Sequence, residues 1–219
     1  HTMIRLRDHH AGTTRFANNQ VVQNVDVRRG ELAVTVAFGG RQGTASTTDF
    51  TAGAIQETVF RAEKIAKVTP VDPEYLPPPD PCMFPARETA KPETMTAGPS
   101  RRLEYANEAI GQCRMENLLA AGAVSSSATA VGIAADTGLL GYEQRGDASF
   151  SLTVQAGDAT GWSAAAHRSI NHLKVQERTL TAISRAKRSR DGRELFPVRE
   201  SRDTVPVIVR VYHGYVWPC

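Results

Sequence analysis

The sequence is poor in cysteine and has no long apolar run. Cys82, Cys113 and Cys219 are an odd number at long spacings, which argues against a disulfide framework and against a CxxC metal site. Reduced thiols fit a cytoplasmic protein best. No stretch approaches the roughly 18 consecutive apolar residues that a membrane helix needs. The start, His1-Thr2-Met3-Ile4, lacks the basic-then-apolar layout of a signal peptide, so we expect a cytoplasmic protein that does not enter a membrane.

The motifs of zinc and serine hydrolases are also missing. The sequence contains no HExxH, HExxxH or GxSxG, the patterns that set metal ligands or a nucleophile beside a catalytic base. The remaining candidates are His9-His10, His167 with His172, His213 with Cys219, and the run Ser125-Ser126-Ser127. The histidine spacings do not place two ligands on one helical face, and the serines are typical of a small-residue strand. We therefore predict no catalytic, cofactor-binding or metal-binding residue in this chain.

Charge gives little indication of a nucleic-acid partner. The net charge is +3, and its local excess falls between Arg185 and Arg193. No aromatic residues interleave with these cations, so we interpret them as a solvated helix end rather than a phosphate-binding surface. Gly39 to Gly43 is the only glycine-rich candidate for a phosphate loop, but it lies between predicted antiparallel strands and fits a hairpin better. Glu57 and Glu177, near the starts of two predicted helices, are interpreted as partners of the helix dipoles.

The ordered part of the chain begins with a strand-and-helix unit over residues 13–68. Within it Glu31 to Phe38 alternates strictly between apolar and polar residues, which predicts a strand with one buried face. Arg28-Arg29-Gly30 is predicted as a turn before that strand, and Gly39-Gly40 as a tight hairpin after it. Apolar residues then repeat at helical spacing from about Thr51 to Lys67. Residues 1–12 are expected to be a disordered edge.

A proline-rich connection separates this unit from the rest. Residues 69–99 carry nine prolines, which is typical of an extended connection rather than of a helix or strand. Because Tyr75, Leu76, Met83 and Phe84 lie inside it, we expect the segment to pack against the fold. A helix is predicted from about Ser100 to Ala121, with Gly122 at its stop position.

Residues 100–190 hold this helix and a second unit that repeats the first. Strands are predicted over 123–135, 139–144 and 149–154, with a turn at Arg145-Gly146-Asp147 and a hairpin at Gly157-Asp158. Equivalent glycines are offset by 118 residues and the glutamates by 120, which is consistent with a duplication. We therefore predict an α+β, two-layer fold in which two related β-meander-plus-helix units pack their helices on a mixed, mainly antiparallel sheet, overall one compact domain.

Several short motifs, taken together, resemble one protein family. They are Phe16-Ala17-Asn18-Asn19, Gln23-Asn24-Val25, Gly43-Thr44-Ala45-Ser46-Thr47 and Asp72-Pro73 in the first half, and Gly138-Leu139-Leu140-Gly141-Tyr142, Gly161-Trp162, Ala166-His167-Arg168 and Glu177-Arg178-Thr179 in the second. In order and spacing they resemble the amino-terminal and central regions of the TldD/PmbA family, over roughly residues 13–189. The resemblance implies a cytoplasmic metallopeptidase family, historically described as modulators of DNA gyrase.

The resemblance also implies partners and a division of labour. Family members act as homo- or heterodimers of TldD-like and PmbA-like subunits on extended, unstructured peptides. Zinc is held by an HExxxH helix and a later cysteine in a region following this one, and PmbA-like subunits generally lack that motif. No zinc ligand therefore transfers to any residue of this chain, which we expect to be inactive alone. Its expected role is to wall the channel that admits the peptide and to support dimerisation.

The last part of the sequence departs from the family. Residues 191–219 form a divergent tail, and Arg210 to Cys219 resembles nothing in the family, as a frameshifted, truncated or divided reading frame would produce. Whether the parent was TldD-like or PmbA-like stays open. The alternative from another class is a free-standing protein-interaction module without enzymatic activity, which would bind one folded partner saturably.

Overall fold

The chain folds around a single six-stranded sheet. The computed structural model describes residues 1–82, 84 and 89–190. The strands are β1 (Thr2–Ala17), β2 (Gln20–Phe38), β3 (Arg41–Thr47), β4 (Leu119–Ala135), β5 (Leu140–Ala156) and β6 (Ala159–His167). The helices are α1 (Ala52–Val68), α2 (Pro92–Met95), α3 (Pro99–Met115) and α4 (Val175–Arg190), with a 3-10 helix, η1, at Ile170–His172. None of the described helices is both long and apolar enough to span a membrane.

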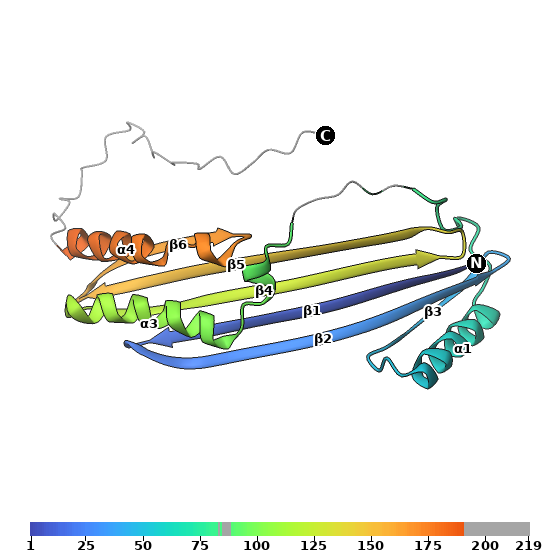
Figure 1. The fold of residues 1–219 in the computed structure, drawn as a ribbon, viewed down its shortest axis with the longest axis horizontal. Helices are drawn as coiled ribbons and strands as arrows, with labels where there is room; N and C mark the ends of the chain where they lie inside the picture. Colours follow the sequence, from blue (N-terminus) through green and yellow to red (C-terminus); the bar gives the residue numbers. More distant parts are fainter. Residues whose placement is uncertain (83, 85–88, 191–219) are drawn as a thin grey trace, which may run out of the picture.

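The sheet has the strand order β3-β2-β1-β4-β5-β6, and each neighbouring pair among the described strands is antiparallel. Figure 1 shows the long strands running along the molecule, with α3 and α4 at one end and α1 at the other. The predicted α+β fold is confirmed, and so is its division into two meander-plus-helix units. The sheet is more regular than predicted, since the described strands include no parallel pair.

In each unit, strands with alternating apolar and polar residues form a β-meander, and a helix packs closely against it. In β2, Leu32, Val34 and Val36 are buried on one face, as their period of two predicts. Gly39 and Gly40 turn the chain with φ of 53° and 77°, and Thr51 caps α1 by accepting a hydrogen bond from the Ala54 amide. The second unit repeats these steps, with Gly157 (φ 65°) in its hairpin.

An approximate two-fold axis relates the two units. Adding 118 to the β1–β2 pair Thr2↔Val36 gives Ala120↔Val154, which is a pair of β4 and β5. The same shift carries the β2–β3 pairs onto those of β5 and β6. It also exchanges the two members of the β1–β4 pair His10↔Ala128, so the axis passes through the centre of the sheet at that pair.

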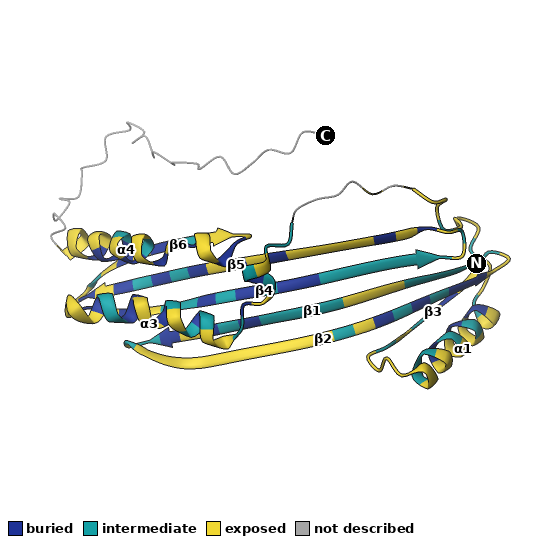
Figure 2. Ribbon diagram, viewed as in Figure 1, coloured by how far each residue is buried: buried dark blue, intermediate teal, exposed yellow. Residues whose placement is uncertain are grey.

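The core is divided between the two ends of the sheet. The larger cluster lies under α3 and α4 around Phe16, Val124 and Phe150, and the smaller one lies under α1 around Val34. Both clusters occupy the same face of the sheet. Figure 2 shows the exposed stretches of β2 and β5 that lie beyond these clusters.

The expectation of a disordered edge over residues 1–12 is wrong. This segment forms most of β1 and pairs with β2 on one side and β4 on the other. Arg5 and Arg7 lie at exposed positions of this central strand, where the ladder satisfies the backbone on both sides. A central position in the sheet does not require apolar side chains where no helix covers the face.

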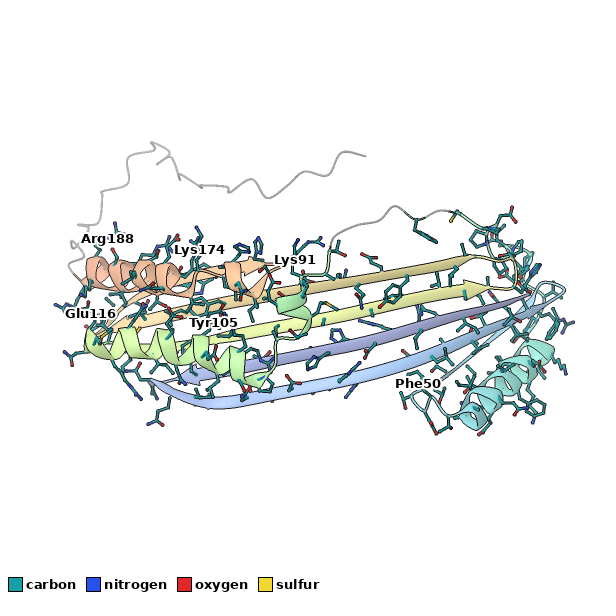
Figure 3. All side chains as sticks on the ribbon, viewed as in Figure 1. Phe50, Lys91, Tyr105, Glu116, Lys174 and Arg188 are labelled. Atoms are coloured by element: carbon teal, nitrogen blue, oxygen red, sulfur yellow. The ribbon has the colours of Figure 1, made fainter. Side chains whose placement is uncertain are left out.

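Two predicted turns are also wrong, because both lie inside continuous strands. Arg28-Arg29-Gly30 belongs to β2 and Arg145-Gly146-Asp147 to β5. The glycines serve contacts instead: a Cβ on Gly30 would lie 2.7 Å from the ring of Phe50, labelled in Figure 3, and one on Gly146 would lie 3.0 Å from Thr94.

The predicted end of the second helix, at Ala121, is wrong as well. α3 ends at Met115, Asn117 reverses the chain with a φ of 55°, and Gly122 lies in β4. A Cβ on Gly122 would lie 2.2 Å from the Ser151 carbonyl oxygen, so this glycine permits strand packing rather than stopping a helix.

The described part of the proline-rich connection contacts the fold at two turns, although Leu76, one of the residues that suggested packing, is 84% exposed. The Asp72 amide donates to the Gly40 carbonyl at 2.8 Å, and the Thr137 hydroxyl donates to the Pro79 carbonyl at 2.9 Å. The tail 191–219, with His213 and Cys219, lies outside the described residues.

The repeated glycine contact yields a stability prediction. A Cβ on Gly43 would lie 2.3 Å from backbone atoms of Ala62 and Ala66 in α1, and one on Gly161 would lie 2.1 Å from the Ala182 carbonyl in α4. Gly43→Ala and Gly161→Ala should each lower the free energy of unfolding by on the order of 2 kcal/mol, because the helix must move off the sheet. Urea unfolding followed by circular dichroism measures this.

The control is a glycine with free space around it. Nothing lies within 4 Å of a Cβ on Gly111, inside α3. Gly111→Ala should therefore raise the free energy of unfolding by about 0.5–1 kcal/mol. Equal stability changes at all three glycines would contradict the close approach of α1 and α4 to the sheet.

Candidate functional site

The histidines considered from the sequence take structural positions. The rings of His167 and His172 are 4.9 Å apart, and the Ser169 amide donates to His167 Nδ1 at 2.9 Å. His9 Nδ1 lies 2.8 Å from Thr129 Oγ1, so this part of the chain is held in the sheet. Within the described ranges, no group of three or more His, Cys, Asp or Glu side chains could hold a metal ion.

The other sequence candidates also contribute structure. Ser125 Oγ lies 3.0 Å from Thr13 Oγ1 across the β1–β4 pair, and Ser126 is buried against α3. Glu177 lies in the first turn of α4, as expected for a dipole partner, whereas Glu57 lies beyond the first turn of α1. Burial raises the pKa of the Cys113 thiol to about 11, which makes it a poor nucleophile.

A fully buried cation, Arg102, was missed by sequence reasoning. Its side chain is fully buried (0% exposed), although it lies near the start of α3. Arg102 Nη2 donates to Asp26 Oδ2 at 2.6 Å and Nη1 donates to Ser126 Oγ at 3.0 Å, which connects α3 to both β2 and β4. The available signal was its spacing, because Arg102 lies four residues before Ala106 and seven before Ala109, on the buried stripe of the helix.

Gly12 in β1 makes room for this guanidinium. A Cβ at Gly12 would lie 2.2 Å from Arg102 Nη2 and 2.3 Å from Cζ. The planar guanidinium therefore lies directly against the strand backbone, close to the two-fold axis. Asp26 is shared, since it also contacts His10 Nε2. We interpret the group as an anchor that fixes α3 on the sheet.

The two outer strands leave two lengths of sheet edge without a strand partner. β3 pairs with residues 32–38 of β2, and β6 pairs with residues 148–156 of β5. On β5 the connection approaches the free length: the Gly146 amide donates to the Thr89 carbonyl at 3.2 Å, and the Thr89 hydroxyl donates to the Gln144 carbonyl. On β2, the free residues from Gln20 to Arg29 are exposed throughout.

The face opposite the helices carries two hollows near the axis. One, of about 270 Å³, is lined by charged side chains that include Arg5, Arg7 and Glu143. The other, of about 420 Å³, is lined by small and hydroxyl residues such as Thr13 and Ser125. The shift of 118 carries Arg7 onto Ser125, so the hollows occupy related places but differ in chemistry.

These features define the class of protein first: a duplicated strand-and-helix domain with an anchored helix and an open sheet edge. Residues 3–66 match the family model for PmbA/TldA metallopeptidase domain 1. The resemblance to the TldD/PmbA family noted in the sequence is thereby confirmed over these residues. No curated protein matches the sequence.

Solved structures share the fold at low sequence identity. TldE from Thermococcus kodakarensis has a TM-score of 0.74 at 18% identity, covering 85% of this chain and 44% of its own. A protein from Thermotoga maritima described as a "putative modulator of a DNA gyrase" gives 0.70 at 16%, covering 85% and 44%. One of similar description from Bacteroides thetaiotaomicron gives 0.67 at 13%, covering 85% and 45%. The chain thus spans less than half the length of these proteins.

The Arg102 anchor predicts a large stability difference between two adjacent arginines. Arg102→Ala should lower the free energy of unfolding by about 3 kcal/mol, since it removes a buried cation and leaves Asp26 and Ser126 without their partner. Arg101→Ala, at a side chain 43% exposed, should cost less than about 1 kcal/mol. Similar losses in urea unfolding would contradict the anchor.

Asp26 predicts a loss of stability in acid. Burial raises its pKa, but hydrogen bonds from His10 and Arg102 outweigh burial and hold the pKa below its ordinary value of 3.8. Ionised Asp26 therefore stabilises the fold above the unfolded-state pKa, and this contribution is lost as pH falls through the lower folded-state pKa. Asp26→Asn should shrink the stability difference between pH 7 and pH 3 in denaturant titrations, and Asp147→Asn, at an exposed carboxylate, is the control. An unchanged difference in Asp26→Asn would refute the assignment.

Proposed function

We propose that this chain is the scaffold and substrate-channel region of a TldD/PmbA-type zinc metallopeptidase or of its zinc-free partner subunit, which acts in proteolysis of unstructured peptides. The family match to a metallopeptidase domain supports the enzyme class. The absence of a metal-holding cluster among the described residues supports a role in binding rather than hydrolysis. In this proposal zinc and its activated water belong to another part of the parent enzyme. The protein works in the cytoplasm, as a dimer with a related subunit.

The observation that carries the binding role is the free edge of β2. Its exposed length from Gln20 to Arg29 presents backbone N–H and C=O groups that no described strand pairs. An extended peptide can add to such an edge through main-chain hydrogen bonds. These bonds do not depend on side chains, so the edge suits unstructured peptides of varied sequence.

The chain's own contact at β5 supports this mode of binding. Thr89 forms hydrogen bonds with the Gly146 N–H and the Gln144 carbonyl, two backbone groups on the free edge of β5. The two-fold relation, a shift of 118 residues, places Gly146 and Gln144 of β5 at the positions of Arg28 and Asp26 of β2. The Arg28 N–H is therefore the group on β2 that corresponds to the Gly146 donor. Arg28 is also exposed and pairs with Asp8 through its guanidinium, at 2.6 Å. Charged edge residues of this kind discourage sheet-to-sheet aggregation without closing the edge.

Removing one backbone donor tests the edge. Arg28→Pro deletes an outward N–H and should weaken binding of an eight-residue Thr-Val repeat peptide by roughly tenfold, the value of about one hydrogen bond and its lost partner. Proline is tolerated on an edge strand where the N–H faces solvent. Isothermal titration calorimetry measures the dissociation constant, and circular dichroism verifies the fold.

The matched control keeps the donor and removes the side chain. Arg28→Ala loses the ion pair with Asp8 but retains the N–H, so it should bind the peptide within about twofold of the parent chain. If Arg28→Ala weakens binding as much as Arg28→Pro, the side chain and not the edge is responsible. Binding that is unaffected by either variant would place the peptide elsewhere.

The proposal that zinc lies in another part of the parent enzyme predicts that the pure chain is not a peptidase. The pure chain, supplied with zinc chloride, should not cleave a denatured peptide, because the described residues offer no metal cluster. Mass spectrometry of the peptide after incubation with and without chelator measures this. Chelator-sensitive cleavage would show that the chain carries its own catalytic site.

A further inference from the structure

Two half-exposed valines line the free edge of β2. Val25 and Val27 are 41% and 42% exposed. The residue between them, Asp26, faces α3, since its carboxylate accepts a hydrogen bond from Arg102. Successive side chains of a strand alternate between its faces, so both valines lie on the sheet face opposite the helices. They form a short apolar row along an edge that no described strand pairs, in the length of β2 that Figure 2 shows as exposed.

The repeat shows that the fold does not require valines at these positions. The shift of 118 residues places Glu143 and Arg145 of β5 at the positions of Val25 and Val27. Both β5 residues are exposed, and theirs is the edge that Thr89 contacts. Protection against sheet-to-sheet pairing would place charges on the open edge rather than on the edge already contacted. The distribution is the reverse of this, so such protection does not explain where the valines lie.

We propose that Val25 and Val27 determine which extended peptides bind best at β2, by favouring segments with apolar residues at two positions two apart. This inference rests on the proposed binding role of the edge and adds the chemistry of its substrate. A strand added to the edge places alternate side chains on one face, each beside a residue of β2. Main-chain hydrogen bonds then hold the peptide, and the alternate side chains distinguish one sequence from another.

The direction of the backbone groups brings these side chains close together. The Arg28 N–H corresponds to the outward Gly146 donor of β5. In an antiparallel ladder the N–H and C=O of one residue point to one side of the strand, and those of its two neighbours point to the other. The backbone groups of Val25 and Val27 therefore point to β1. An antiparallel peptide meets both valines at non-hydrogen-bonded pairs, where the Cα atoms are about 4.5 Å apart and the side chains are closest.

The helix-bearing face of the same edge favours polar peptide side chains. Asp26 and Arg28 lie on that face, and each is already in an ion pair, with Arg102 and Asp8 respectively. An apolar peptide side chain here would take water from charged groups without offering them a hydrogen bond, whereas a hydroxyl side chain can bond to them. The favoured substrate is therefore an extended segment that is apolar on one side and polar on the other.

Two peptides of one composition test this selection. The alternating peptide Thr-Val-Thr-Val-Thr-Val-Thr-Val has valines two apart, whereas Thr-Thr-Val-Val-Thr-Thr-Val-Val has none at that spacing. Isothermal titration calorimetry of the unaltered chain should give a dissociation constant about threefold lower for the alternating peptide, since the other peptide places only one valine against the pair. Equal dissociation constants would overturn the selection and leave the edge role in place. Absence of binding by both peptides would instead contradict the proposed function, and the selection with it.

Matched variants assign the preference to the valines. Val25→Thr combined with Val27→Thr keeps the β-branched shape and the backbone but replaces an apolar methyl group by a hydroxyl, so both peptides should bind equally. Val71→Thr, the same change at a 55% exposed valine outside the strands, should keep the preference. A preference that persists in the double variant would refute the role of the valines.

A single substitution provides the readout if circular dichroism shows that the double variant does not fold. Val27→Thr alone leaves one valine on the edge, and either peptide can place a valine beside it. The preference for the alternating peptide should therefore disappear in this variant too. An unchanged preference would show that the spacing of two valines on β2 is not what the chain recognises.

Discussion

The antiparallel pairing of β1 with β4 holds the two units together. It runs from Met3↔Ala135 to Phe16↔Gly122, with the two-fold axis at His10↔Ala128. Because each unit contributes one full-length strand to this junction, the helices of the two units lie at opposite ends of one sheet. The four long strands also extend beyond the short outer strands β3 and β6, which leaves a length of each sheet edge without a strand partner.

Arg102 shows how the two halves became different on a shared backbone. Gly12 lacks the Cβ that Ala130 carries at the corresponding position, so only the second half accepts a guanidinium against the strand. The cost of burying this cation is offset by Asp26, Ser126 and two backbone carbonyls. The anchor is thus a specific contact that fixes α3 in position, added to a repeat whose general packing is apolar.

Sequence reasoning predicted the elements that obey a simple period and missed those set by long-range contacts. The alternation from Glu31 to Phe38, the Gly39-Gly40 hairpin and α1 were all predicted, because their signals are local. Gly30 and Gly146 were read as turns, since nothing nearby in sequence shows that Phe50 and Thr94 lie over them. The resemblance implied a channel wall for an extended peptide but did not identify an open sheet edge. Its location on β2 required the register, because the free length is defined by where β3 stops.

The two sheet edges differ in whether their backbone groups are already hydrogen-bonded, which affects where a peptide could bind. A duplicated sheet offers two related edges, and two open edges would allow sheets to stack end to end. Thr89 satisfies outward groups on β5, whereas the corresponding groups of β2 have no strand beside them. One edge is therefore occupied by the chain itself and one is available. In the proposed binding role, an extended segment would therefore add at β2 alone, and the duplicated fold would stay intact.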